Sequence, residues 1–194
     1  MNSQVKAYYD LANEYHVSAV FLWQRIMDTP FLYNPVCYLL RHTIELQLKG
    51  LIVKELRKDS KKLVLKDIKL DSHKMNSVHS LLFLWDKYKC LLSSHKAVLN
   101  PEITSFIDSA INKVDKKDFS STKYRYPFDK SEKAIKMFPV DISIDGNAPD
   151  LSSGVPTIIQ FGNEVGVINK GQKSMVDTSC LFDVSALLFS FMEE

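Results

Sequence analysis

Long apolar runs, a signal peptide and a strong charge of one sign are all missing from this sequence of 194 residues. No run of 18 apolar residues occurs, so we expect no membrane-spanning helix. The first residues, Met1–Gln4, have neither the basic nor the apolar stretch of a signal peptide, which favours a cytoplasmic location. A formal net charge of +2, with lysines spread along the chain, gives no electrostatic argument for binding to nucleic acid or a membrane.

Cysteine is also scarce. The three cysteines, Cys37, Cys90 and Cys180, are odd in number, lie far apart and form no C-x-x-C pair. This excludes a disulfide framework and a paired-cysteine zinc site. Each lies in an apolar stretch typical of a helix, and we therefore expect three buried, reduced thiols.

Motifs of common enzyme sites are absent as well. There is no glycine-rich phosphate loop and no Gly-x-Ser-x-Gly elbow. Three histidines have no helical partner at the spacing of metal ligands: His16, His73 and His95. The sequence therefore predicts no metal site and no cofactor.

What the sequence does contain is helical periodicity. Apolar residues recur every three or four positions, and the predicted helices cover residues 5–27, 34–57, 78–92, 100–116 and 178–192. The first has an inner stripe of Val5, Tyr8, Ala12, Tyr15, Ala19, Leu22 and Ile26. The second is expected to begin with Asn34 as its N-cap and Pro35 in its first position, and Asn100 with Pro101 repeats this pattern. The fourth has an inner face of Ile103, Phe106, Ile107, Ala110, Ile111 and Val114.

The predicted architecture is a single, mainly α-helical domain of about five helices. Residues 1–117 form a four-helix core, residues 118–175 an irregular excursion, and residues 176–194 a closing helix. Within the excursion, residues 158–161 and 165–168 alternate around Gly162 and Asn163, which predicts a small β-hairpin. The lysine-rich segment 58–76 shows little periodicity and is predicted to be a long, mobile loop.

The second helix is unusual because apolar residues flank its charges on both sides. Arg41, His42, Glu45 and Lys49 fall in one narrow sector of the helical wheel. Such charges are expected to face other parts of the protein or a cleft. Buried charges need partners, and the spacing of four residues lets Glu45 meet both Arg41 and Lys49.

Further partners of this sector are expected from elsewhere in the chain. His79 precedes the third helix, and Arg125 is enclosed by aromatic residues in the stretch 123–128, which includes Tyr126. Arginine stacks on aromatic rings and holds carboxylates with two hydrogen bonds, which suits a docked loop. A purely structural ion-pair network and a functional cleft both explain this pattern.

The stretch 38–51, with the sequence YLLRHTIELQLKGL, resembles the central helix of HEPN-like helical domains. The segments around His79 and Tyr124–Pro127 are similar to companion segments of some bacterial members. The resemblance covers about residues 1–130 and the closing helix. It implies a helical bundle, pairing into dimers and, for many relatives, RNA cleavage in toxin–antitoxin or antiphage systems.

One departure from the family pattern concerns catalysis. Catalytic relatives carry an arginine followed, after four to six residues, by a histidine. No arginine of this sequence is followed by a histidine at that distance; Arg41 meets Leu46, Gln47 and Leu48 there.

Two functional hypotheses remain open. In the first, the chain is a defence or toxin-type protein that acts on RNA, as a metal-independent ribonuclease or with a partner protein. Arg41, His42 and His79 are then the candidate catalytic residues, since a base of near-neutral pKa can take the ribose 2′-hydroxyl proton and a cation can stabilise the phosphorane. In the second, the chain is a non-catalytic module for dimerisation or partner binding, and Glu45, Lys49, Arg125 and Tyr126 belong to a structural network.

Overall fold

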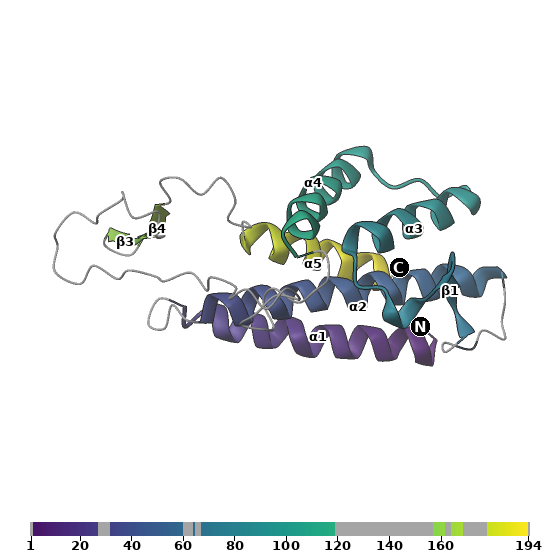
Figure 1. Cartoon of the computed structure of the whole chain (residues 1–194), viewed down its shortest axis with the longest axis horizontal. Helices are drawn as coiled ribbons and strands as arrows, with labels where there is room; N and C mark the ends of the chain where they lie inside the picture. The colour runs from purple at the N-terminus through teal and green to yellow at the C-terminus, as the bar shows by residue number, and fades with distance from the viewer. Residues whose placement is uncertain are drawn as a thin grey trace.

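The computed structural model describes residues 2–26, 32–59, 64, 67–118, 157–161, 164–168 and 178–193. These residues form a mainly helical bundle, shown in Figure 1, with a small antiparallel hairpin before the last helix. The predicted fold class is thereby confirmed. The rest of the predicted excursion, residues 119–156, 162–163 and 169–175, lies outside the described part of the chain.

Helix α1 (Ser3–Trp23) begins where the Asn2 side chain accepts a hydrogen bond from the amide of Gln4 at 2.9 Å. Its predicted inner stripe is confirmed, because all seven of those residues are buried or half-buried. The helix ends at Trp23, short of the predicted residue 27, and a turn follows over residues 24–26. Residues 27–31, which include the predicted break at Pro30, lie outside the described residues.

Helix α2 (Tyr33–Asp59) is the centre of the bundle, and sixteen of its 27 residues are buried. It lies alongside α1 in Figure 1, while α3 and α5 pack on its other sides. A helix enclosed in this way needs apolar residues around most of its circumference, which this sequence supplies. Because α2 already begins at Tyr33, Asn34 lies inside its first turn, and the prediction that Asn34 is the N-cap is wrong.

The predicted mobile loop over residues 58–76 is wrong where the structure describes it, while residues 60–63, 65 and 66 lie outside the described residues. Helix α2 continues to Asp59, and β1 (Lys69–Leu70) pairs antiparallel with β2 (His73–Lys74). A 3₁₀ turn, Met75–Ser77, follows. Asp71 turns the chain between the strands with a φ of 54°, a left-handed conformation that aspartate tolerates. The apolar residues that anchor this segment in the core are Ile68, Leu70 and Met75.

Helix α3 (Leu81–Ser94) and helix α4 (Pro101–Asp118) form the upper layer in Figure 1. Asn100 accepts hydrogen bonds from the amides of Glu102 and Ile103, so the predicted cap of α4 is confirmed. The inner face of α4 is confirmed except for Phe106, which is 38% exposed.

Helix α5 (Thr178–Glu193) closes the bundle and packs on α2, as predicted. Residues of the predicted hairpin form β3 (Thr157–Phe161) and β4 (Glu164–Ile168), with Phe161 paired to Glu164. Of the three cysteines, Cys37 is buried and Cys180 is half-buried, but Cys90 is exposed. No helix in the described ranges is both long and apolar enough to cross a membrane.

Gly50 lies where α2 meets both α1 and α5. A Cβ atom at this position would be 2.6 Å from the terminal methyl of Met192 and 2.9 Å from the Cβ of Tyr8. The flexible Met192 side chain can move, but the Cβ of Tyr8 is fixed to the backbone of α1. Glycine is therefore required by the close approach of α1 to α2.

We predict that Gly50→Ala lowers the free energy of unfolding by about 1–3 kcal/mol through overpacking. This loss outweighs the gain of about 1 kcal/mol in helix propensity. Urea denaturation measures the change, and Ser109→Ala on the exposed face of α4 is the control, expected to stay within about 0.5 kcal/mol of the wild type. A Gly50→Ala protein as stable as the control would contradict the close approach.

Candidate functional site

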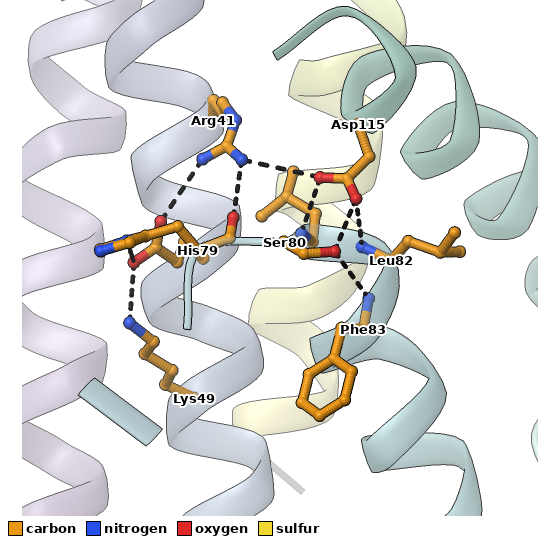
Figure 2. Close-up of polar contacts among 9 residues, drawn as sticks. Arg41, Lys49, His79, Ser80, Leu82, Phe83 and Asp115 are labelled. Atoms are coloured by element: carbon orange, nitrogen blue, oxygen red, sulfur yellow. Dashed lines mark hydrogen bonds and ion pairs between the residues drawn. The ribbon is translucent and has the colours of Figure 1, made fainter. Parts of the chain in front are cut away.

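The charged sector of α2 is enclosed, as predicted. Arg41 is 0%, Glu45 1% and Lys49 4% exposed. Figure 2 shows Arg41 and Lys49 of α2 on the side that faces His79, in the segment that leads into α3, and Asp115 of α4. Arg41, Glu45 and Lys49 thus form a buried ion-pair network, while His42 of the same sector is half-buried.

Glu45 is the centre of this network. One carboxylate oxygen, Oε1, accepts a hydrogen bond from the Nζ of Lys49 at 2.8 Å and lies 3.0 Å from the Nδ1 of His79. The other, Oε2, accepts from the Nη1 of Arg41 at 3.4 Å. Burial alone would raise the pKa of Glu45, but Lys49, then His79 and Arg41, outweigh it, and the net pKa is lowered. Glu45 is therefore held as a carboxylate.

Arg41 extends the network from α2 to two other elements. Its Nη2 donates to the backbone carbonyl of His79 at 2.6 Å and lies 3.6 Å from the Oδ1 of Asp115 in α4. Arginine suits this position because its planar guanidinium donates in several directions at once and keeps its charge when buried. A guanidinium enclosed in this way has no exposed surface for contact with a substrate.

Asp115 joins the start of α3 to α4. Its carboxylate accepts hydrogen bonds from the Ser80 hydroxyl at 2.6 Å and from the amides of Leu81 at 2.9 Å and Leu82 at 3.4 Å (Figure 2). Ser80 itself caps α3 by accepting from the Phe83 amide. A carboxylate at a helix N-terminus satisfies amides that have no partner within the helix and matches the helix dipole.

Sequence reasoning missed Asp115, although a signal was present. Asp115 follows Ile107 and Ile111 at intervals of four residues, so it continues the inner face of α4. A carboxylate in that stripe has to be buried with a partner. The predicted inner face holds only apolar residues, from Ile103 to Val114.

His79 is the member of the network that reaches the surface. Its side chain is 41% exposed, while its Nδ1 faces the buried Glu45 carboxylate. Since a carboxylate only accepts hydrogen bonds, Nδ1 carries a proton in this contact. The outer nitrogen, Nε2, is then the one that would accept or donate a proton in chemistry.

His42 does not join Arg41 and His79. Consecutive residues on a helix point about 100° apart, and His42 instead lies among aromatic rings. Its ring stacks on Tyr38 with centroids 5.8 Å apart and meets Tyr15 of α1 edge-on at 4.7 Å. The three predicted catalytic residues therefore do not converge on one point. The predicted partners Arg125 and Tyr126 lie outside the described residues.

A second buried polar group links α1, α2 and α5. Gln47 is 0% exposed, and its Nε2 donates to the backbone carbonyl of Ser185 at 2.9 Å. The Ser185 hydroxyl lies 2.9 Å from the Nδ1 of His16 on α1. Burial lowers the pKa of His16, which favours a neutral imidazole there. Within the described ranges, no three His, Cys, Asp or Glu side chains come together in a way that would hold a metal ion.

We predict that Arg41→Ala lowers the free energy of unfolding by about 3–5 kcal/mol, because Glu45 and Asp115 lose a buried cation. Chemical denaturation followed by circular dichroism measures the loss. Lys113→Ala, which removes an exposed cation of α4, is the control and is expected to change stability by less than about 0.5 kcal/mol. Equal stability of the two variants would argue against a structural role for Arg41.

Acid is predicted to weaken the fold through Glu45. The pKa of Glu45 in the folded chain is lower than the ordinary value of 4.5. The Glu45 carboxylate therefore contributes its full stabilisation of the fold above about pH 4.5, and this stabilisation is lost as the pH falls through the folded pKa. Urea denaturation between about pH 5 and pH 3 should give a smaller slope of stability against pH for Glu45→Gln than for the wild type. Glu14→Gln, on the exposed face of α1, should keep the wild-type slope. A slope unchanged in Glu45→Gln would overturn this assignment.

Comparison with known proteins gives no match to a family model, a curated protein or a solved structure.

Proposed function

We propose that the chain is a HEPN-like interaction module of a bacterial defence or toxin–antitoxin system, with a structural rather than catalytic Arg41–Glu45–Lys49 network. The observation that carries this proposal is the burial of Arg41, whose side chain is 0% exposed. An arginine that stabilises a phosphorane has to contact its oxygens. Here the guanidinium faces Glu45 and Asp115 instead.

The outer face of α1 is the surface that this proposal assigns to binding. Val17 is 57% and Phe21 is 55% exposed, one helical turn apart and on the side away from the stripe that faces α2. Arg25 covers part of the Phe21 ring, with its Cζ 4.9 Å from the ring centroid. Exposed apolar patches with a charged rim are typical of protein–protein contacts.

The occupant proposed for this surface is a second copy of the chain. Two α1 helices that pair antiparallel about a point between Val17 and Ser18 bring Asp10 of each copy opposite Arg25 of the other, since these residues are equally distant from that point. By the same counting, the two Val17 side chains meet in the middle, and Phe21 of each copy falls opposite Glu14 of the other, with the complementary charges further out. An antiparallel pair of this kind is closed and two-fold symmetric, which limits assembly to a dimer.

We predict that the wild-type chain sediments as a dimer and that Val17→Asp with Phe21→Asp gives a folded monomer. Two carboxylates placed in an apolar contact would lose hydration without gaining partners. Sedimentation equilibrium gives the mass, and circular dichroism reports helicity. The control is Val98→Asp, at a 90% exposed site between α3 and α4, which should remain dimeric. A wild-type monomer at every concentration, or a double variant that still forms a dimer, would contradict the surface assignment.

A second candidate function, RNA cleavage, is favoured by one observation. His79 presents an exposed imidazole whose Nδ1 is held 3.0 Å from the Oε1 of the buried Glu45. A carboxylate behind an imidazole fixes its orientation and tautomer, as a general base requires. In this candidate, Nε2 of His79 takes the ribose 2′-hydroxyl proton, and neither Arg41 nor His42 contacts the substrate.

Incubation of the pure protein with total RNA and a chelator separates the two functions. The interaction module predicts no cleavage by the wild type. Cleavage that is lost in His79→Ala but kept in His42→Ala, with both variants as helical as the wild type, would establish the second candidate and overturn the first. His42→Ala is a suitable control because His42 lies among aromatic rings on the α1 side of the helix.

A further inference from the structure

A histidine joins the C-terminal ends of α2 and α3, remote from the Arg41 network along α2. His95 directly follows α3, and its backbone amide donates to the carbonyls of Leu91 and Leu92. Its side chain extends to the last turn of α2 and is 17% exposed. The ring therefore connects two elements that are far apart in the sequence.

Both ring nitrogens of His95 face carboxylates. Nδ1 lies 2.9 Å from the Oε2 of Glu55, and Nε2 lies 3.1 Å and 3.2 Å from the two carboxylate oxygens of Asp59. A neutral imidazole has only one N–H, so it can donate to one of these groups and turns a lone pair toward the other. Only the imidazolium satisfies both contacts.

The carboxylates themselves favour a cation between them. Glu55 and Asp59 are four residues apart on α2, and like charges at that spacing repel. Glu55 is 3% exposed, and its Oε2 also accepts from the Nζ of Lys58 at 2.7 Å. His95 also lies at the C-terminal end of α3, where the helix dipole stabilises positive charge. Glu55 and Asp59 thus contact the His95 ring, and Lys58 contacts Glu55.

We propose that His95 is a proton-dependent latch that fastens the last turn of α2 to the end of α3 when its ring carries both protons. Loss of one proton breaks one of the two contacts and leaves a lone pair facing a carboxylate. The end of α2 then separates from residues 95–100, which lead from α3 into α4. The latch makes the rigidity of this end of the bundle depend on pH.

The direction of the pH dependence follows from the charge of the latched form. Hydrogen bonds to Glu55 and to Asp59 raise the pKa of His95 above its ordinary value of 6.5, against the opposing effect of burial. The contacts of His95 with Glu55 and Asp59 therefore stabilise the two helix ends fully below about pH 6.5. This stabilisation is lost as the pH rises through the pKa of His95 in the folded chain. The latch is closed in mild acid and open in mild base.

Nuclear magnetic resonance of the full chain tests the proposal directly. We expect both ring nitrogens of His95 to be protonated at pH 6, with a titration midpoint above 6.5. Asp59→Asn should lower that midpoint by about 0.5 unit, as for a partly exposed ion pair. The matched control is Asp86→Asn, which removes an exposed carboxylate paired with Lys89 on α3 and should leave the midpoint unchanged.

Hydrogen exchange tests whether protonation fastens the two helix ends. Amide protection in residues 55–59 and 92–97, taken relative to His95→Gln, should fall between pH 6 and pH 8.5. The amide protection should fall about tenfold for each pH unit by which the titration midpoint of His95 in the folded chain exceeds its midpoint in the unfolded chain. A midpoint that Asp59→Asn does not move, or protection that changes equally with pH in His95→Gln and the wild type, would overturn the latch.

Discussion

The buried carboxylate of Glu45 is the constraint on which the arrangement of this bundle depends. A carboxylate that is 1% exposed is costly unless cations and hydrogen-bond donors surround it, and here they come from two elements. Arg41 and Lys49 lie one helical turn to either side, and His79 comes from the segment before α3. Satisfying Glu45 therefore fixes where the chain enters α3. Through the contact of Arg41 with Asp115, the same network sets the position of α4.

This use of charge explains why α2 carries so many polar residues without an exposed face. Arg41 and Asp115 tie it to the upper layer, and Gln47 ties it to α5 through Ser185. Such polar contacts determine which helix packs against each side of α2. Apolar contacts alone would define this packing less uniquely. Because Arg41 is fully buried, its side chain makes no contact at the surface. Within this network, His79 is the residue whose side chain reaches the surface.

Local pattern predicted much of the fold. The stripe on α1 and the Asn100 cap were correct, because both depend on residues close together in sequence. The enclosure of Arg41 and the contact of Glu45 with His79 followed from the apolar residues around them. The segment before α3 was predicted to be a mobile loop, because its anchors, Ile68, Leu70 and Met75, follow no regular period. Asp115 continues the inner stripe of α4, but the periodicity of α4 does not identify its partners Ser80, Leu81 and Leu82, which are more than thirty positions away. His42 was grouped with Arg41 on the helical wheel, but the aromatic rings beside it come from elsewhere on α1 and α2.

The most direct test of the buried network is a double-mutant cycle on Arg41 and Glu45. Arg41→Met, Glu45→Met and the double variant are compared by the free energy of unfolding in urea. We predict that the double variant is more stable than the sum of the two single losses implies, by about 1–3 kcal/mol, since each single change strands a buried charge. Losses that add to within about 0.5 kcal/mol would mean that the two charges do not depend on each other, and would contradict this account.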